Sequence, residues 1–303
     1  MASPAEIHVI AGALRDGQGR VLIAQRPRGR HMAGRWEFPG GKLGFGEDSY
    51  SGLKRELSEE LGITVREARP LIRLRYEYPD RHVMIEAWQV TAYEGEPKGL
   101  DSQALNWVRP DELPRHDMLE ADRAIVTALR LPRLARVISC ANELAALNGS
   151  AAQTLLWQAP PGDSLSSETV RAARTAGHRV FAFGSDLDAV RDAALSGCDG
   201  AVLPWQGQSL HVDRDGAFLI GVHCEHADAA HEAVEEGAHF LVVAPEAGPM
   251  AQEEVEALCE TIGLPVFAGW YSDASRLERV QLAGAHGCAL LSSRDPGRRQ
   301  AGD

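Results

Sequence analysis

Three glutamates, Glu56, Glu59 and Glu60, are the residues whose types and spacing point most directly to chemistry. At positions i, i+3 and i+4 of a helix, their side chains lie together and can share a cation. Three like charges so close repel one another at neutral pH, and a hard divalent cation removes this repulsion. Mg²⁺ favours a few carboxylates and leaves its other positions to water and substrate phosphates. We therefore expect a site for metal ions and phosphates.

The residues around these glutamates predict the helix that positions them. Asp48 can cap a helix that runs to Leu61, and Gly62 favours the left-handed conformation that ends many helices. A merely solvated acidic face is the alternative interpretation, and Arg55 with the glycine-rich approach argues against it. One stripe of the helix is apolar and should face the core: Tyr50, Leu53, Leu57 and Leu61.

Together these features resemble the Nudix box, which residues 41–63 match without a departure. Nine specified positions would match by accident with a probability on the order of 10⁻⁷. The stretches 31–42, 77–82 and 94–97 are similar to the MutT-type 8-oxo-dGTP diphosphatases, and the resemblance covers about residues 5–131. Within the box, Gly41, Glu47 and Arg55 would support the site, with Arg55 paired to Glu59 or Glu47.

The resemblance implies Mg²⁺-dependent hydrolysis of an acid anhydride, with Mn²⁺ as an alternative metal. The substrate would be 8-oxo-dGTP, dGTP or a related nucleoside triphosphate, cleaved to the monophosphate and pyrophosphate in support of DNA replication fidelity and repair. The same resemblance implies that Glu56, Glu59, Glu60, Asp101 and the Gly40 carbonyl bind metal. Glu56 is the first choice for the base and Glu60 for a direct ligand, and clustered carboxylates leave these roles open because their titrations are coupled.

Residues before and after the box would bind the nucleotide. Arg26, His31 and Lys42 could supply positive charge to the triphosphate, and Arg81 lies in a segment that matches the base-side loop of the family. For each of these residues a solvated surface position is the alternative. The full set expected to contact substrate is Arg26, His31, Glu37, Phe38, Pro39, Gly40, Lys42, Arg81 and Asp122.

Asp122 is the one departure from the family pattern in this domain. The family has an asparagine at this position. An amide can accept a hydrogen bond from the N7–H of 8-oxoguanine and donate one to O6, whereas an ionised carboxylate only accepts. The O6 bond is then lost or requires a protonated Asp122. Losing one buried hydrogen bond costs about 1–3 kcal/mol, so we expect a relaxed or redirected base preference.

Length and composition limit the remaining possibilities. The chain has 303 residues, more than twice what a Nudix domain uses, so a second domain is required. No run of 18 apolar residues and no secretory signal are present, which predicts a cytoplasmic protein without a membrane span. Five cysteines without CxxC spacing suit free buried thiols. A net charge of −12 favours a small nucleotide over nucleic acid as partner. The oligomeric state stays open.

The hydrophobic pattern predicts two domains of different architecture. Residues 1–131 read as a mixed α/β sandwich, with a sheet between helices and the domain boundary at Leu131-Pro132. Its expected strands are Ile7–Leu14, Val21–Gln25, Leu71–Glu77, Val83–Tyr93 and Asn106–Arg109, with helices in the box and at Asp122–Leu129.

Beyond residue 133, short apolar runs alternate with helical stretches that end in glycine, which predicts a small (β/α)₈ TIM barrel over residues 132–293. Some of its helices must be short or missing, for instance after 200–203. The expected helices are Glu168–Ala176, Leu187–Ser196, Ala227–Glu236, Gln252–Ile262 and Ser275–Ala283. The expected strands are Arg136–Cys140, Thr154–Gln158, Arg179–Phe183, Gly200–Leu203, Leu219–His223, Phe240–Ala244, Pro265–Gly269 and Cys288–Ser292.

The segments 197–203, 220–224 and 283–289 resemble thiamine-phosphate synthases. That family binds phosphates with a Thr-Lys-rich loop and a Gly-Gly turn, where this chain has 244–249, which is acidic, and 268–271, which holds Trp270 and Tyr271. We therefore expect a barrel without synthase activity. Trp205, Trp270 and Tyr271 could line a pocket or simply pack in the core. Residues 294–303 read as a disordered tail.

Three functions remain open: a nucleotide pyrophosphohydrolase with an accessory barrel, a bifunctional enzyme that acts on a thiamine-type pyrophosphate, and a ligand-sensing module without turnover. The complete acidic set favours the first of these.

Overall fold

The structure is a computed structural model that describes residues 6–79, 81–147, 149–158, 165–184, 192–210, 218–245 and 248–291. The chain divides into two compact units, Met1–Arg130 with Cys259–Gly263 and Leu131–Leu258 with Leu264–Asp303. The expected tail, 294–303, and most of the expected helix 187–196 lie outside the described residues.

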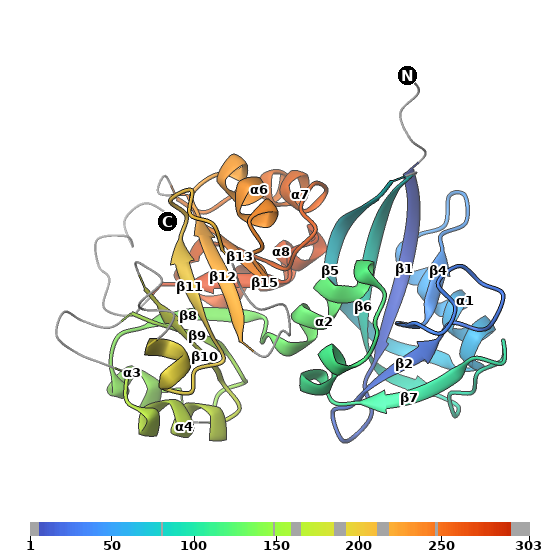
Figure 1. Cartoon of the computed structure of the whole chain (residues 1–303), viewed down its shortest axis with the longest axis horizontal. Coiled ribbons are helices and arrows are strands. Elements are labelled where there is room, and N and C mark those ends of the chain that lie inside the picture. Colours follow the sequence, from blue (N-terminus) through green and yellow to red (C-terminus); the bar gives the residue numbers. More distant parts are fainter. Residues whose placement is uncertain are drawn as a thin grey trace. The chain divides into compact units, whose positions relative to one another are not determined.

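The first unit holds two sheets (Figure 1). The four-stranded sheet has the order β4-β1-β6-β5, with β1 parallel to β6 and the other pairs antiparallel. Its strands are β1 (Glu6–Leu14), β4 (Gly40–Lys42), β5 (Thr64–Tyr78) and β6 (Arg81–Glu94). The three-stranded sheet has the order β3-β2-β7, with β2 (Val21–Gln25), β3 (Trp36–Glu37) and β7 (Ala104–Val108).

Helices α1 (Ser49–Leu61) and α2 (Arg123–Arg130) pack on opposite sides of strand β1. Because side chains alternate along a strand, Ile10 and Leu14 join the buried cluster that contains the α1 leucines. Ala11 and Ala13 join the other cluster, with Ile125 of α2. The predicted α/β/α sandwich is therefore confirmed.

Helix α1 begins and ends where the sequence predicts. The Asp48 Oδ1 atom accepts a hydrogen bond from the backbone N–H of Ser51 at 3.0 Å, and Gly62 adopts a left-handed conformation with φ of 68°. Leu53, Leu57 and Leu61 are fully buried, as expected. Tyr50 is only half-buried, against the ring of Trp88.

Four short elements of this unit, two strands and two 3₁₀ helices, escaped the sequence prediction. Strands β3 and β4 have two and three residues, too few to show any alternation. Strand β5 extends over 15 residues, whereas the prediction began at Leu71, because its early residues alternate irregularly and its pairing with β6 shifts register near Val65 and Pro70. Two 3₁₀ helices, Pro110–Arg115 and Glu120–Asp122, precede α2.

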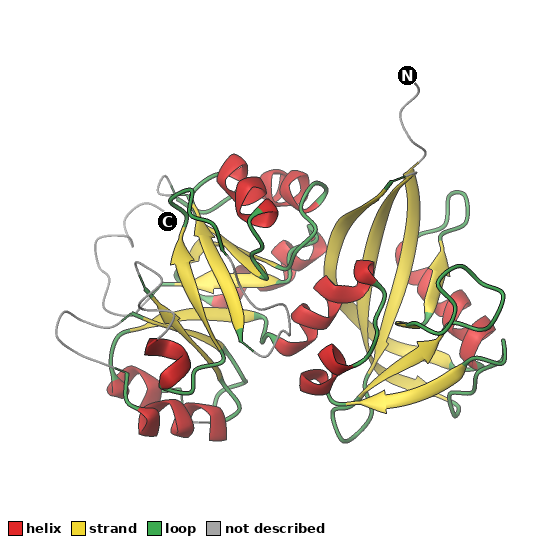
Figure 2. Ribbon diagram, viewed as in Figure 1, coloured by secondary structure: helices red, strands yellow, loops and turns green. Residues whose placement is uncertain are grey.

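The second unit is a closed barrel of eight parallel strands, which confirms the predicted number and architecture (Figure 1; Figure 2). All eight strands match their predicted ranges to within two residues at each end. They are β8 (Leu134–Ile138), β9 (Thr154–Trp157), β10 (Arg179–Phe183), β11 (Gly200–Pro204), β12 (Leu219–Cys224), β13 (Phe240–Val243), β14 (Val266–Tyr271) and β15 (Gly287–Leu290).

Short helices follow several of these strands, as the length of the barrel requires. No helix occurs in residues 205–210, the part of the β11–β12 connection that the structure describes. The helices are α3 (Ala141–Ala145), α4 (Ser167–Thr175), α6 (Ala227–Glu235), α7 (Gln252–Cys259) and α8 (Leu277–Leu282), with a 3₁₀ turn at Ala274–Arg276.

The barrel interior is filled by side chains, so the barrel is a packed core and not a pore. The rings of Phe181 and Phe267 each contact that of Phe240 edge-on, and all three are fully buried. Phe183, His223 and Trp270 meet nearer the carboxyl ends of the strands. Tyr271 is buried as well.

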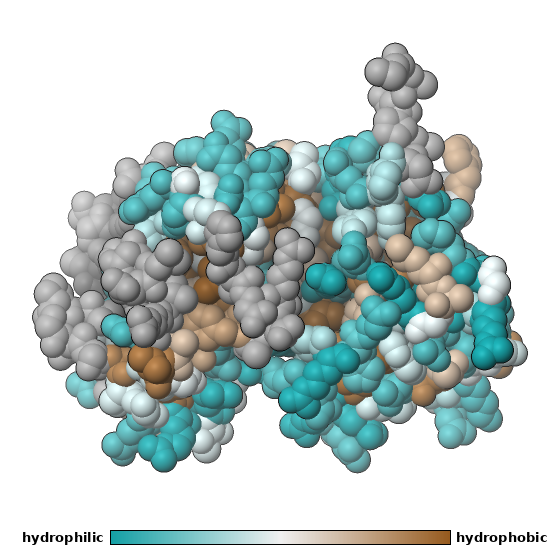
Figure 3. Space-filling model, viewed as in Figure 1, coloured by the Kyte–Doolittle hydropathy of each residue, from teal (hydrophilic) through white to brown (hydrophobic). Residues whose placement is uncertain are grey.

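The described surface is largely polar. Figure 3 shows hydrophilic side chains over much of the visible face. Among the described residues, the exposed large hydrophobic side chains are Phe45, Leu100, Leu195 and Leu282. No described helix combines the length and apolar character needed to cross a membrane. All five cysteines are free, and Cys140 alone among them is not buried.

Candidate active site

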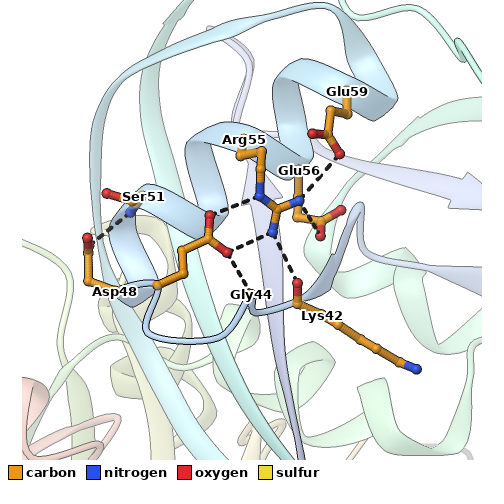
Figure 4. Close-up of polar contacts among 8 residues, drawn as sticks. Lys42, Gly44, Asp48, Ser51, Arg55, Glu56 and Glu59 are labelled. Atoms are coloured by element: carbon orange, nitrogen blue, oxygen red, sulfur yellow. Dashed lines mark hydrogen bonds and ion pairs between the residues drawn. The ribbon is translucent and has the colours of Figure 1, made fainter.

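An arginine organises the polar face of α1 (Figure 4). The Arg55 guanidinium donates to both carboxylate oxygens of Glu47 at 2.9 and 2.8 Å. It also donates to Glu56 at 2.8 Å, to Glu59 at 3.3 Å and to the Lys42 carbonyl at 3.1 Å. Arg55 therefore pairs with both partners that the sequence offered, and with Glu56 in addition. The hydrogen bonds from Arg55 lower the pKa of Glu47 to about 2.

Glu60 is held toward strand β4, away from Arg55. The backbone N–H of Gly40 donates to Glu60 Oε2 at 3.1 Å. Burial raises the pKa of Glu60 to about 7, and the negative charges of Glu37, Glu56 and Asp101 act in the same direction, against the Gly40 hydrogen bond. The charged form of Glu60 is thus disfavoured at this position.

Two glycines allow β4 to lie tightly between β1 and α1. A Cβ atom at Gly40, whose φ is 152°, would lie 2.0 Å from the Ile10 carbonyl oxygen. A Cβ atom at Gly41 would lie 2.4 Å from Glu56 Oε2. The Ile10 backbone excludes a side chain at Gly40, and a side chain at Gly41 would displace the Glu56 carboxylate. Glu56 and Glu60 therefore lie directly against the β4 backbone.

The loop that carries Asp101 is attached to the carboxyl end of α1. A helix leaves its last carbonyls without partners inside the helix, and here the Glu60 carbonyl accepts from Leu100 N–H at 3.0 Å and from Gln103 Nε2 at 3.1 Å. Gln103 Oε1 in turn accepts from Asp101 N–H at 2.8 Å. These bonds bring Asp101 to the same pocket as Glu60.

Two adjoining pockets form one cleft in this unit. A pocket of about 580 Å³ is lined by the box glutamates and Asp101, and a pocket of about 390 Å³ is lined mainly by apolar side chains with Asp122. The residues common to both pockets are Arg26, Arg30, Glu37, Gly40, Gly41 and Lys42.

Asp122 is the buried polar residue of the smaller pocket, with 7% of its surface exposed. Its Oδ2 accepts from the backbone N–H of Phe38 at 3.1 Å, and in the part of the chain that the structure describes Oδ1 has no protein partner. Burial raises the pKa of Asp122 to about 7, partly opposed by the Phe38 hydrogen bond. The side chain is therefore a neutral carboxylic acid in a large fraction of molecules at neutral pH.

Residues 10–128 match a family model described as the NUDIX domain. The 8-oxo-dGTP diphosphatase of Escherichia coli (strain K12) is 34% identical over 125 residues, which cover 41% of this chain and 97% of that protein. The chain belongs to the Nudix family. The first unit is accordingly a Nudix hydrolase domain, and Nudix hydrolases generally use a divalent metal ion, usually Mg²⁺.

Other relatives of the Nudix domain have different names. The CTP pyrophosphohydrolase of Escherichia coli (strain K12) is 35% identical over 130 residues, 43% of this chain and 96% of that protein. A solved structure of MutT, from work on Aliivibrio salmonicida and Vibrio cholerae, has 32% identity, covers 41% of this chain and 97% of that chain, and has a TM-score of 0.37.

The carboxylate oxygens of the Nudix site are donor atoms that suit a hard cation. Within the described residues, no three acidic, histidine or cysteine side chains are already gathered in metal-binding geometry. Glu56, Glu59, Glu60 and Asp101 nevertheless line one pocket with Gly40. Burial first, and the neighbouring negative charges after it, raise the pKa of Glu60, and a bound cation would offset both effects by stabilising the charged carboxylate. Oxygen donors of this kind suit Mg²⁺.

The structure places nearly every predicted substrate residue on the cleft. Arg26 forms an ion pair with Glu37 and donates to the His31 carbonyl at 2.8 Å. The Arg81 guanidinium lies over the Tyr78 ring, 5.5 Å from its centroid. Of the predicted substrate residues, Pro39 alone lines neither pocket, and its carbonyl instead accepts from Gly12 N–H at 2.8 Å. The remaining predicted substrate residues, which also line the cleft, are Phe38, Gly40, Lys42 and Asp122.

Among the polar residues of the cleft, sequence reasoning missed three, Arg30, Tyr78 and Gln103. Arg30 lies between two residues that were predicted, Arg26 and His31, and its charge was a usable signal. Tyr78 belongs to the stretch already assigned to the base side. Gln103 carries no local signal, because its role depends on the end of a helix 43 residues away in the chain.

Proposed function

We propose that the chain is a Mg²⁺-dependent nucleoside triphosphate pyrophosphohydrolase that acts on the cytoplasmic nucleotide pool, releasing the monophosphate and pyrophosphate. One observation carries the proposal: an apolar pocket with a hydrogen-bonding acid adjoins a pocket of carboxylates, and cationic residues line both. A nucleotide has a base at one end and a chain of phosphates at the other. The apolar pocket suits the base, and the pocket of carboxylates, with a cation bound, suits the phosphates.

Different residues of the cleft would bind the metal, accept the proton and bind the phosphates. Glu56, Glu59, Glu60, Asp101 and the Gly40 carbonyl would hold the metal, which when bound neutralises phosphate oxygens and lowers the pKa of the attacking water. A box carboxylate, with Glu56 the first candidate, accepts the proton of that water. Water oxygen bonds to phosphorus as the bond to the pyrophosphate oxygen breaks. Arg26 and Lys42 support the leaving phosphates.

The raised pKa of Asp122 favours one of the two possibilities left open for base recognition. A neutral acid offers one acceptor and one donor, as an asparagine does, and can therefore pair with both N7–H and O6 of 8-oxoguanine. Support for the neutral form comes from the burial of the carboxyl group, which outweighs the opposing effect of the Phe38 hydrogen bond on its pKa. We therefore propose that oxidised guanine nucleotides are substrates when Asp122 is protonated.

A cytidine nucleotide is the second candidate substrate. Cytosine presents a donor at N4 beside an acceptor at N3, which also matches a neutral carboxylic acid. The relative named CTP pyrophosphohydrolase supports this candidate.

The barrel, proposed to span residues 132–293, is assigned no synthase activity. The chain has no lysine after Lys98, so no lysine of the barrel can bind a phosphate. Trp270 and Tyr271 are both buried where the resembling family has its second glycine. A thiamine-type pyrophosphate substrate or a sensor role would require a different use of the Nudix cleft, and the experiment below separates them.

Replacing Glu60 by glutamine in the full chain tests this mechanism. We expect Glu60→Gln to reduce pyrophosphate release from 8-oxo-dGTP, dGTP and CTP by at least about 100-fold, because it removes a carboxylate at the centre of the charged pocket. Release of pyrophosphate and phosphate is measured for these nucleotides and for thiamine pyrophosphate. Glu67→Gln, an exposed glutamate outside the cleft, is the matched control. Full activity in Glu60→Gln contradicts the mechanism, and turnover of thiamine pyrophosphate alone supports the thiamine alternative.

A further inference from the structure

Arg30 lies where the two pockets of the Nudix cleft adjoin, and it lines both of them. Its guanidinium Nη2 is 3.7 Å from Asp101 Oδ2. Both side chains are more than half exposed, at 66% and 54%. Burial raises the pKa of Glu37, and the positive charges of Arg26 and Arg30 oppose this rise, so Arg30 also interacts with a second carboxylate of the cleft.

The two loops that carry this ion pair have an unusual backbone. Met32 and Ser102, with φ of 58° and 62°, are the non-glycine residues of the described chain that have positive φ. Each lies within two residues of one member of the pair. Such conformations cost on the order of 1–3 kcal/mol and persist where surrounding contacts hold them.

A hydrogen bond from a neighbouring residue holds each of these loops. The Arg26 side chain donates to the His31 carbonyl at 2.8 Å and fixes the first loop. Gln103 accepts from Asp101 N–H at 2.8 Å and fixes the second. The Arg30–Asp101 contact is therefore made between two anchored loops, by the ends of two exposed side chains that remain adjustable.

We infer that Arg30 is a triphosphate-binding residue that pairs with Asp101 until a cation and the triphosphate bind. This inference rests on the proposed function, because it assumes that Asp101 binds a cation and that phosphates enter the larger pocket. Arg30 and a cation compete for the same carboxylate. Once displaced from Asp101, the guanidinium is beside the phosphates, which it can bind through two parallel hydrogen bonds. Arg30 thus opposes metal binding in the empty site and favours triphosphate binding.

The test compares Arg30→Ala with Arg28→Ala in the full chain. Both variants remove one positive charge, and Arg28 is an exposed residue that lines neither pocket. Mn²⁺ binding without nucleotide is measured by electron paramagnetic resonance, and binding of a non-hydrolysable triphosphate analogue is measured by calorimetry. We expect Arg30→Ala to bind Mn²⁺ about threefold more tightly and the analogue about tenfold more weakly. Arg28→Ala should change each by less than about twofold.

A second pair of variants tests whether Asp101 carries the effect. In an Asp101→Asn background, Arg30→Ala should no longer tighten Mn²⁺ binding, because neighbouring residues that interact are not additive. Arg30→Lys should restore part of the analogue affinity. Equal Mn²⁺ shifts for Arg30→Ala and Arg28→Ala, or weaker Mn²⁺ binding by Arg30→Ala, would overturn the inference. These readouts need no turnover, so a chain that shows the exchange without releasing pyrophosphate refutes only the proposed function.

Discussion

Asp122 is the buried side chain that we propose to influence substrate choice. The smaller pocket of the cleft encloses its carboxyl group, and one of the two oxygens accepts a hydrogen bond from the Phe38 backbone. With a pKa of about 7, the group changes its hydrogen-bonding character near neutral pH. Below that pH it can both donate and accept, and above it can only accept.

Base selectivity should therefore depend on pH through Asp122. We expect Asp122→Asn to raise the ratio of kcat/KM for 8-oxo-dGTP over dGTP by about tenfold at pH 8.5, since the amide supplies the O6 donor that the carboxylate lacks. At pH 6 the gain should be small because Asp122 is then protonated. Glu120→Gln, which changes an exposed neighbouring carboxylate, is the control. An unchanged ratio at both pH values would show that Asp122 does not contact the base.

The same group should make stability depend on pH. Its pKa is 3.8 when unperturbed and about 7 when folded, so between those values the folded state binds more protons than the unfolded state. Stability then falls as pH rises through this window, by up to about 4 kcal/mol, and is level on either side. We expect Asp122→Asn to unfold at higher denaturant concentration than the wild-type protein at pH 8, with little difference at pH 4. A larger stabilisation at pH 4 than at pH 8 would contradict this sign.

At the scale of elements, local signals were sufficient for α1 and for the eight barrel strands. The cap at Asp48, the stop at Gly62 and the apolar runs of the barrel all depend on neighbours in sequence. The contacts that complete the site do not. Gln103 reaches the end of α1, and Arg30 reaches Asp101, only after folding brings distant segments together.

The barrel also has a repeated turn that single-residue patterns did not reveal. His178, Asp199 and His239 each follow a glycine by one or two residues, and each accepts a hydrogen bond from a backbone N–H at or next to the start of the preceding strand. The three donors are Gln153, Val180 and Ile220. This use of a polar residue after glycine becomes visible only when the parallel pairing is known.

Strand β14 was predicted to end at Gly269, and it continues to Tyr271 through a bulge. Gly269 has φ of 65°, and the register shift between Ala268 and Trp270 turns the indole into the interior cluster. Such a bulge re-aims a side chain, which a strictly alternating pattern cannot predict.

Gly269→Ala should destabilise the barrel by about 2–3 kcal/mol. The left-handed conformation costs about 1 kcal/mol with a side chain, and the added Cβ would lie 2.8 Å from the Tyr271 ring. Gly207→Ala is a matched control, because φ is 73° there and no atom lies within 4 Å of the added Cβ. Urea unfolding measures both. Equal losses for the two variants would show that the Tyr271 contact relaxes without cost.

At the scale of the whole molecule, the described buried side chains form separate clusters in the two units. Leu57 belongs to the cluster under α1 and Phe240 to the barrel interior, and both are fully buried. The sequence also predicted two folds, because the apolar pattern changes near residue 131 from mixed strands to alternating strands and helices.

Variants in the two cores should have separable consequences. Phe240→Ala should cost about 3–5 kcal/mol of barrel stability and leave kcat/KM for nucleotide hydrolysis within about twofold, because Phe240 belongs to the core of the barrel and the cleft is lined by residues of the first unit. Leu57→Ala should cost about 2–5 kcal/mol and also reduce kcat/KM, since Leu57 packs the helix that carries Glu56, Glu59 and Glu60. Unfolding curves and initial rates are measured on the same preparations below the unfolding transition. A change confined to a separate core should leave the positions of the glutamates unchanged. If Phe240→Ala nevertheless reduced kcat/KM as much as Leu57→Ala, the barrel would be part of the catalytic unit.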